Sequence, residues 1–408
     1  MDKLATTCVI AGGGPAGMMA GFLLARAGIE VIVLEKHKDF LRDFRGDTVH
    51  PSTLELLWEL GLLDRFLTRP HQEVKEISVE IGNRKFRAVD FTRLPIHRNF
   101  TALMPQWDFL NFLSSEAKRY PAFHLMMQAE AIDLLSERNR YEGLRVRTTN
   151  GECEIRARLV IAAEGRHSRL REAAGLEVLD RGAPIDILWL RLPVAESDPT
   201  EPVGRFGAGQ ILVMLYRGDY WQCALVIPKG GFERLKAEGI EAFQSRLKEI
   251  AGFAGDRVRT VKSFDDVSLL TVTVDRLQRW AKRGLLCIGD AAHAMSPVGG
   301  VGINLAIQDA VAAVNILSPV FLNGNLPSLH DLDLVQRRRE WPTKVTQEFQ
   351  LVVQNRILAQ GLESRTVPAP PLALRLLNRW SWLRQFPARF VGIGVRPEHI
   401  HTPDCLAK

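Results

Sequence analysis

A cluster of glycines near the amino terminus places the strongest constraint on how this chain folds. Gly12, Gly14 and Gly17 follow a short β-branched run that predicts a buried strand. The next stretch, PAGMMAGFLLARAG, has the residue spacing of a helix, and EVIVLE is typical of a second buried strand. A strand, a glycine turn, a helix and a parallel strand form a βαβ unit, so the sequence predicts an α/β fold.

The spacing Gly12-x-Gly14-x-x-Gly17 also indicates what the turn binds. Glycines at a strand-to-helix turn let backbone N–H groups and the start of the helix approach a pyrophosphate. Glu35 ends the second strand, where its carboxylate is placed to accept hydrogen bonds from a ribose diol. The pattern therefore predicts a dinucleotide site, but these residues alone leave NAD and FAD both open.

Length and composition exclude several other classes of protein. With 408 residues and 46% hydrophobic content, the chain is expected to form two domains. The 53 basic and 47 acidic residues give a net charge of +6, which we expect to be spread along the chain. No basic stretch is interleaved with aromatic residues, so nucleic-acid binding is not expected. Five well-separated cysteines without a C-x-x-C pair, and a start unlike a signal peptide, predict a cytoplasmic protein.

The order of helical and strand-like stretches predicts a discontinuous first domain. Residues 1–75, 102–180 and 271–345 have the texture of a parallel sheet with helices, including helices over 52–67 and 105–119. Residues 76–101 and 181–270 resemble antiparallel strands, apart from a helix near 232–250, and predict a β-rich substrate domain. Residues 346–408 are expected to be a C-terminal helical segment. The interface between the two domains is the expected cleft.

A second motif lies far downstream, where a buried strand ends in Gly289 and Asp290. An aspartate in this position can bind sugar-alcohol hydroxyls, and the Pro-Gly loop that follows can lie flat against a ring. The helix that begins near Gly302 directs its positive end toward the same place. A Gly-Asp pair alone is a weak signal, and its distance from the first motif makes it stronger.

The two motifs in this order resemble those of the single-component (class A) FAD-dependent aromatic monooxygenases of the p-hydroxybenzoate hydroxylase type. The resemblance covers about residues 5–345 and implies a Rossmann-like FAD/NAD(P)-binding domain with an inserted β-rich domain. It makes the glycine cluster an FAD site, with Glu35 on the ADP half and Asp290 on the ribityl chain. The cofactor-binding residues that it implies are Gly12, Gly14, Pro15, Ala16, Gly17, Glu35, Arg45, Gln106, Asp290, Gly300, Gly302, Ile303 and Asn304.

A third motif departs from the family pattern. The family has Asp-Gly before a short basic run, whereas this chain has Glu164 before Gly165 and the run RHSRLR. In the family this segment is associated with the FAD pyrophosphate and with NAD(P)H. The replacement therefore puts the handling of the nicotinamide in doubt, but not the binding of FAD. Arg45, with Arg42 as the alternative, falls where the family places an arginine against the cofactor phosphates.

The resemblance implies an FAD-dependent monooxygenase that hydroxylates an aromatic or quinone-like small molecule. NAD(P)H reduces the flavin, O₂ forms a C4a-hydroperoxide, and an electron-rich ring attacks the terminal oxygen. A flavin dehydrogenase or reductase without oxygen insertion is one alternative, and a non-enzymatic FAD-binding redox sensor is another. WSW at 380–382 differs from the W-x-W-x-I-P pattern of flavin halogenases. The substrate, its regiochemistry and the choice between NADH and NADPH stay open.

The residues that contact the substrate are the weakest prediction. Candidates are Tyr216 and Tyr220 on an expected hairpin, where a tyrosine could polarise a phenol, and Pro297 in the loop opposite. His50 and His293 are expected to be structural, and no metal site is expected from His399-x-His401. A homodimer and a peripheral membrane contact are further alternatives. The membrane contact rests on an amphipathic stretch with Ala373, Leu376, Leu377, Trp380 and Leu383 on one face, flanked by Arg375, Arg379 and Arg384.

Overall fold

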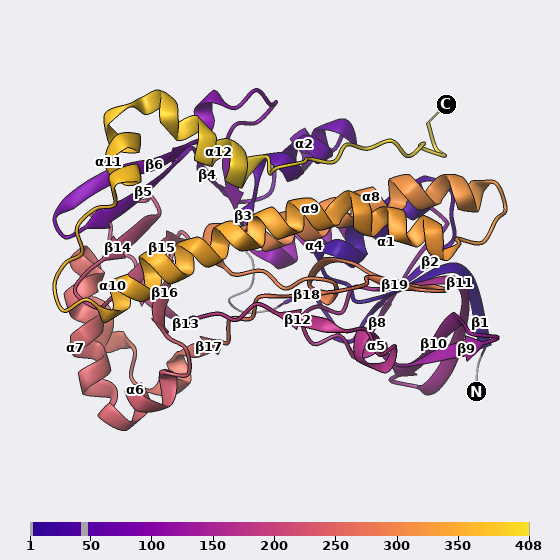
Figure 1. Ribbon diagram of the computed structural model, residues 1–408, viewed down its shortest axis with the longest axis horizontal. Helices are drawn as coiled ribbons and strands as arrows, with labels where there is room; N and C mark the ends of the chain where they lie inside the picture. Colours follow the sequence, from indigo (N-terminus) through magenta and orange to yellow (C-terminus); the bar gives the residue numbers. More distant parts are fainter. Residues whose placement is uncertain (1–2, 42–47, 408) are drawn as a thin grey trace.

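The computed structural model describes residues 3–41 and 48–407, and it has two large β-sheets at opposite ends of an elongated molecule (Figure 1). Long helices connect the two ends, and both chain termini lie at the end that holds the first sheet. The mixed α/β fold class expected from the sequence is confirmed. The domain boundaries expected from the sequence stay predictions.

The first sheet is built around parallel strands in the order β8-β2-β1-β11-β20. Their register places Ala11, at the end of β1, beside Leu34 and Ala162, and Ala162 beside Cys287. The carboxyl ends of four parallel strands therefore meet at one edge, as ligand sites in such sheets require. The parallel strands are β1 Lys3–Ala11, β2 Val31–Glu35, β8 Phe123–Met127, β11 Gly151–Ala162 and β20 Leu285–Cys287. The antiparallel additions are β9 Glu130–Glu137, β10 Arg140–Thr148 and β19 Ala281–Lys282.

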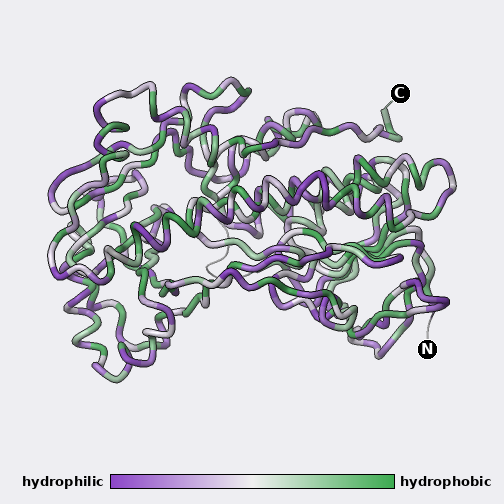
Figure 2. Tube along the Cα trace, in the orientation of Figure 1, coloured by the Kyte–Doolittle hydropathy of each residue, from purple (hydrophilic) through white to green (hydrophobic). Residues whose placement is uncertain are grey.

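Helices α1 (Pro15–Arg26), α4 (Gln106–Ala117) and α8 (Gly302–Leu322) pack with this sheet in the largest hydrophobic core. The stretch Val298–Leu322 is apolar and long enough to cross a membrane, but 72% of its most apolar window is buried inside the molecule. α8 lies between α1 and α9 (Leu329–Val353), so its apolar residues serve the core. Hydrophobic and hydrophilic residues alternate along most of the remaining chain (Figure 2).

The second sheet has seven strands in the order β17-β13-β16-β15-β14-β5-β6. Its pairs are antiparallel except β14 with β5, which joins the early hairpin to the later strands. One face is covered by α6 (Phe232–Glu238), α7 (Ile240–Ala251) and the short helix η2 (Gly252–Thr260). The strands are β5 Glu76–Ile81, β6 Arg84–Asp90, β13 Ile185–Pro193, β14 Val203–Phe206, β15 Ile211–Tyr216, β16 Tyr220–Pro228 and β17 Ser268–Leu270.

Two helices expected as single elements are each divided at a glycine with positive φ. The stretch expected over 52–67 forms α2 (Pro51–Glu59) and α3 (Leu63–Phe66), and the chain turns at Gly61, whose φ is 68°. The helix expected near 232–250 is divided between α6 and α7 at Gly239, whose φ is 90°. The helical spacing of apolar residues continues across both turns, so the sequence pattern did not reveal that each helix is divided.

Short strands and the C-terminal segment complete the fold. α9 is followed by a π-turn (η6, Gln354–Leu358) and α10 (Ala359–Glu363), and α11 (Leu372–Arg379) and α12 (Gln385–Gly392) then pack on β6. The last residues return to the first sheet, where Arg26 donates to the carbonyl oxygens of Thr402 and Pro403. The short elements are β3 Thr48–Val49, β4 Gln72–Val74, β7 Thr101–Leu103, α5 Arg169–Ala173, β12 Val178–Asp180, β18 Asp275–Leu277, and the 3₁₀ turns η1 Phe91–Arg93, η3 Phe264–Asp266, η4 Gly289–Ala291, η5 Val298–Gly300 and η7 Ser381–Arg384.

A buried ionic chain connects the second motif to this C-terminal segment. Asp309 on α8 accepts from the backbone N–H of Gly289 at 3.1 Å and lies 2.6 Å from His293 Nε2. Its other oxygen is 3.0 Å from Arg339 Nε on α9, and Arg339 Nη1 is 3.0 Å from Glu398 Oε1. Burial alone would raise the pKa of Asp309, but His293 and Arg339 hold that pKa below its usual value. His293 is therefore structural, as expected from the sequence.

Arg339→Met is expected to lower the free energy of unfolding by about 3–5 kcal/mol, because it leaves the buried carboxylates of Asp309 and Glu398 without their shared cation. Arg338→Met is the matched control, since the partly exposed Arg338 contacts only Glu398, and it should cost less than about 1 kcal/mol. Urea unfolding of both variants beside the parent measures the difference. Equal losses in the free energy of unfolding would show that the buried ion pairs of Arg339 stabilise the protein no more than the partly exposed ion pair of Arg338.

Candidate FAD site

The three glycines of the first motif are required for different reasons. A Cβ on Gly17 would lie 1.9 Å from the carbonyl oxygen of Gly12, and a Cβ on Gly12 would lie 2.3 Å from that of Ala163. Gly12 also has a φ of 109°, which side chains rarely adopt. Around Gly14, in contrast, no atom lies within 4 Å of a Cβ position. Packing of the chain thus explains Gly12 and Gly17, while Gly14 faces open space.

The open space lies in front of the first turn of α1. Gly14 is the N-cap residue, Pro15 is the first helical residue, and no side chain caps this helix end. The free N–H groups and the positive end of the helix dipole suit an anion such as a diphosphate. Ala16 packs behind the turn, where its Cβ lies 3.1 Å from a Cβ built on Gly289. The first and second motifs are therefore in contact.

Glu35 supplies a buried carboxylate beside this turn. Its Oε1 accepts from the backbone N–H of His37 at 3.0 Å, and its Oε2 lies 3.0 Å from a Cβ built on Gly13. Gly13 is thus the third glycine of the cluster, after Gly12 and Gly17, that has no room for a side chain. A carboxylate at this strand end suits the ribose diol of an ADP moiety.

Asp290 lies across the sheet edge from Glu35, in the turn η4 that follows β20. Its half-buried carboxylate is 3.6 Å from Nη2 of Arg166, and Nη1 of Arg166 donates to the carbonyl oxygen of Thr271 at 3.4 Å. Arg166 therefore connects the second motif, the third motif and the residue that follows β17 of the second sheet. This role of Arg166 was not predicted from the sequence, where its place in the basic run after Gly165 was the signal.

The unusual Glu164 caps a short helix. Its Oε2 accepts from the hydroxyl of Ser168 at 2.6 Å and from the backbone N–H of Leu170 at 3.4 Å, at the start of α5. Burial raises the pKa of Glu164 although these hydrogen bonds oppose it. Arg171 of α5 then donates to the carbonyl oxygens of Arg166 and Ala291. The Glu164 side chain thus fixes the conformation of the third motif by hydrogen bonds to Ser168 and Leu170.

The loop before α8 is held by glutamines of α9 that the sequence analysis missed. Gln350 accepts from the N–H of Ser296 and donates to the carbonyl oxygens of Ser296 and Val298, at 2.8–3.1 Å. Gln347 donates to the carbonyl oxygen of Ala294, and Gln354 to the hydroxyl of Ser296. All three glutamines are buried; Gln347 and Gln350 lie on α9, Gln354 begins η6, and their helical spacing was the signal in the sequence. Pro297 stands half-buried in this fixed loop.

The side chain of Asn304 is fully engaged with the protein. Its Oδ1 accepts from the N–H of His50 at 2.9 Å and from the hydroxyl of Thr53 at 2.6 Å, and its Nδ2 donates to the carbonyl oxygen of Thr48. Thr48 in turn donates to the carbonyl oxygen of Gly300 at 2.9 Å. Asn304 therefore positions the segment 48–53 against the Pro-Gly loop.

For the remaining predicted cofactor residues, the structure gives a position but no contact that tests their role. Gly302 and Ile303 form the first turn of α8, and Gln106 is the first residue of α4; all three are half-buried. Arg45 and its alternative Arg42 lie outside the described residues. Nδ1 of His399 lies 2.5 Å from Glu59 Oε1, and the N–H of His401 donates to Asn315 Oδ1. This His-x-His segment therefore docks the C-terminal tail.

His50 is a buried base beside the Pro-Gly loop. Neither ring nitrogen has a hydrogen-bond partner among the described residues, although the backbones of Val391, Gly300 and Gly299 lie near the ring. Burial lowers the pKa of His50 to about 4, and the nearby backbone groups only partly oppose this shift. His50 is therefore neutral at physiological pH.

The two tyrosines of the expected hairpin point to opposite faces of the second sheet. Tyr216 packs edge-on against Trp221, in the core that α7 and η2 cover, so its side chain faces away from the Pro-Gly loop. This overturns the candidacy of Tyr216. Tyr220 alternates with Trp221 and shares the other face with Val226, which packs with Val298 of the loop. Tyr220 is six positions from Val226, roughly 20 Å along the strand.

Taken together, the residues fit FAD. The first motif leaves room at Gly14 in front of an uncapped helix, which suits a diphosphate. Glu35 and Asp290 provide carboxylates on either side of that point, which suit the hydroxyls of a ribose and of a ribityl chain. The loop 296–300 and the start of α8 form the neighbouring wall. Among the described residues no group of three His, Cys, Asp or Glu side chains is placed to hold a metal ion.

Comparison with known proteins agrees with this assignment. Residues 5–348 match the FAD binding domain family. The chain is 32% identical over 384 residues to 6-methylpretetramide 4-monooxygenase of Streptomyces rimosus, covering 93% of this chain and 90% of that protein. It is 27% identical over 319 residues to rifampicin monooxygenase of Streptomyces venezuelae, covering 74% of this chain and 62% of that longer protein. The crystal structure of p-nitrophenol 4-monooxygenase from Pseudomonas putida has the same fold, with a TM-score of 0.74, 19% identity, and coverage of 95% of this chain and 97% of that one.

The chain belongs to the FAD binding domain family. It is a flavoprotein monooxygenase, an oxidoreductase that uses FAD as its cofactor and NAD(P)H as its co-substrate. The choice between NAD and FAD, which the glycine cluster left open, is settled in favour of FAD. The individual site residues stay predictions, and the contacts described above are what supports them.

Gly14→Ala and Gly17→Ala are expected to separate binding from folding. Alanine at 17 forces its Cβ against the carbonyl oxygen of Gly12, so the protein should lose stability without any ligand present. Alanine at 14 meets no atom within 4 Å and has an ordinary φ of −74°, so apo-protein stability should stay near that of the parent. FAD affinity should nevertheless fall about tenfold or more for Gly14→Ala, because the methyl group enters the space of the diphosphate.

Urea unfolding of the apo-proteins and fluorescence titration with FAD supply both numbers. If Gly14→Ala binds FAD as tightly as the parent, the diphosphate does not lie at this turn.

Acid should destabilise the protein through His50. The unfolded chain binds a proton near pH 6.5 and the folded protein only near pH 4, so stability falls as the pH drops through this interval. The contribution lost by this residue is about 3 kcal/mol. His50→Gln should flatten the decline in the free energy of unfolding between these pH values, whereas His124→Gln, at an exposed strand position, should not. Identical pH profiles for all three proteins would refute a buried neutral His50.

Proposed function

We propose that this monooxygenase hydroxylates a phenolic aromatic compound that lies between the loop 296–300 and the facing side of the second sheet. The observation that supports the substrate class is the 32% identity to 6-methylpretetramide 4-monooxygenase over nearly the full length of both chains. Relatives named for rifampicin and for pentachlorophenol agree with an aromatic substrate. Either NADH or NADPH serves as reductant, and O₂ supplies the oxygen atom.

When bound, FAD accepts a hydride from NAD(P)H and activates O₂. The protein has to position the ring, exclude water and leave the loop rigid. The glutamines of α9 fix the loop 294–298, and Thr48 fixes Gly300, so the wall beside the cofactor is held on two sides. Val298 packs against the hydrophobic cluster that contains Ile185, Ile211 and Val226, which closes the apolar side of the space against the sheet. Water is thereby kept from this part of the site.

The facing side of the sheet also carries polar groups that suit a phenol. Gln222 is buried, its Oε1 accepts from Arg217 Nε at 3.0 Å, and its Nε2 has no hydrogen-bond partner among the described residues. Tyr220 lies on the same side, and the guanidinium of Arg191 stacks 4.7 Å from the centre of its ring. An unpaired buried amide costs about 1–3 kcal/mol, so a substrate oxygen that accepts from Gln222 recovers this loss.

The test is oxygen transfer. The FAD-loaded enzyme is assayed with NADH and with NADPH under ¹⁸O₂, in the presence of 6-methylpretetramide, anhydrotetracycline, p-nitrophenol or pentachlorophenol. We expect at least one compound to accelerate NAD(P)H oxidation and to gain one ¹⁸O atom by mass spectrometry. If every compound yields only hydrogen peroxide, with no labelled product, the proposed substrate class is wrong.

Variants of the sheet locate the substrate. Gln222→Leu should lower kcat/KM by about tenfold, because it removes a polar group that faces the proposed substrate space. Tyr220→Phe should have a smaller effect, because Tyr220 lies roughly 20 Å along the strand from Val226, where the loop meets the sheet. Tyr216→Phe is the matched control, because its ring packs on the opposite face. All three should retain FAD. Equal effects of Tyr216→Phe and Gln222→Leu would place the substrate elsewhere.

A further inference from the structure

The charge of the chain is concentrated in one C-terminal segment. Residues 364–397 contain six arginines and no Asp, Glu or Lys, so their formal charge of +6 equals the net charge of the whole protein. The expectation that the basic excess is spread along the chain is therefore wrong. The rest of the protein is formally neutral, and the segment stands out as a cationic strip on it.

The same segment exposes large apolar side chains. Leu372 is 67% exposed, Trp382 52% and Phe386 58%, and Leu376 and Trp380 are exposed as well. Leu372 and Leu376 are one helical turn apart on α11, whose Asn378 accepts from the backbone N–H of Arg87 on β6. The helix thus rests on the sheet edge by one side and presents leucines on another.

The exposed set differs from the face expected from the sequence. α11 ends at Arg379, so Trp380 and Trp382 follow the helix and do not continue its periodicity. Leu377 and Leu383 are half-buried, and the buried Arg384 donates to the carbonyl oxygens of Leu377 and Asn378. Arg384 therefore fixes the turn after α11 and does not flank an exposed face.

The exposed arginines of the strip have no partner charge. Arg375 and Arg379 lie one turn apart on α11, and Arg389 is on α12. None of these three forms an ion pair with any described residue, although ion pairs with Asp or Glu hold other exposed arginines, such as Arg87 and Arg98. Unpaired guanidinium groups beside exposed tryptophans and leucines are the combination found in helices that lie in a membrane surface.

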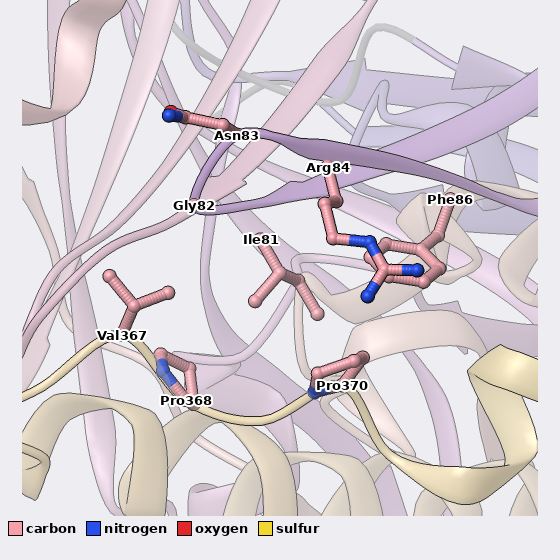
Figure 3. A pocket seen from close by; sticks show the side chains of 8 residues that line it. All are labelled: Ile81, Gly82, Asn83, Arg84, Phe86, Val367, Pro368 and Pro370. Carbon is pink, nitrogen blue, oxygen red and sulfur yellow. The ribbon is translucent and has the colours of Figure 1, made fainter.

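An apolar groove of about 490 Å³ precedes α11. It lies between the tip of the β5–β6 hairpin and the proline-rich residues before the helix, and Figure 3 shows Ile81 pointing toward Pro368 and Pro370. Arg84 stands over the ring of Phe86 on the other side, 5.4 Å from its centre. None of the groove residues belongs to the FAD site. The groove extends the apolar surface of α11 toward the hairpin.

We propose that residues 367–389 bind the surface of an anionic phospholipid bilayer. The leucines, tryptophans and Phe386 enter the boundary between head groups and acyl chains, while Arg375, Arg379 and Arg389 contact lipid phosphates. A second copy of the chain fits this surface poorly, because a two-fold contact would place the same unpaired arginines opposite one another. A bilayer supplies both the apolar layer and the negative charge that the strip lacks.

Flotation with vesicles tests the proposal on the FAD-loaded, full-length enzyme. We expect it to float with vesicles of phosphatidylcholine and phosphatidylglycerol, to stay behind with phosphatidylcholine alone, and to be released by salt. Arg375→Gln with Arg379→Gln should weaken partitioning about 30-fold. Leu372→Ser with Trp382→Ser should also abolish flotation. Trp fluorescence of the parent should shift to shorter wavelength with anionic vesicles.

The matched control changes an arginine and a leucine that are exposed far from the strip, Arg138→Gln with Leu326→Ser, and should float like the parent. Retained FAD absorbance shows that each variant is folded. Sedimentation velocity checks for a dimer. Three results would each overturn the proposal: no flotation of the parent, equal flotation of all variants, or a dimer that the strip variants lose while vesicles have no effect. Hydroxylation without vesicles does not depend on these residues, so the two proposals can fail separately.

Discussion

The parallel register of β2, β1, β11 and β20 is the constraint on which the rest of the structure depends. Because these strands end side by side, segments that are far apart in the sequence leave the sheet at one edge. Gly14, Glu35, Glu164 and Asp290 are neighbours for this reason. A shift of one residue in any pair would turn the alternate side of that strand toward the helices and separate the motifs.

Several interactions serve this edge without touching a cofactor themselves. Asn304 and Thr48 hold the Pro-Gly loop from one side, and the buried pair Asp309 and Arg339 holds the turn at Gly289 from below. Asn304, Asp309 and Arg339 are buried, Thr48 is half-buried, and each is hydrogen-bonded within the protein. Polar contacts within the protein therefore fix the positions of the loops at the carboxyl ends of the parallel strands, and the hydrophobic core packs behind these contacts.

The sequence predicted the motifs better than the contacts between them. Glycine spacing, strand texture and Glu35 identified the fold and the cofactor because local backbone requirements leave a local pattern. The alternation of residues along a strand can be read from the local sequence, but what packs on each face cannot. Tyr216 and Tyr220 could therefore not be distinguished from the sequence. In the structure Tyr216 lies on the face covered by α7, and Tyr220 lies on the face that carries Val226 and meets Val298. The role of Gln350 likewise depends on a helix that meets its loop from more than fifty positions away.

The glutamines of α9 give that helix a fixed rotational phase. Gln347 and Gln350 of α9, with Gln354 at the start of η6 that continues it, contact the chain between Ala294 and Val298 from a single side. One residue inserted upstream would rotate all three by about 100° and break every contact at once. Substitutions on the outer surface of α9 leave the phase unchanged. We therefore expect the chain to tolerate changes of residue along α9 far better than changes of its length.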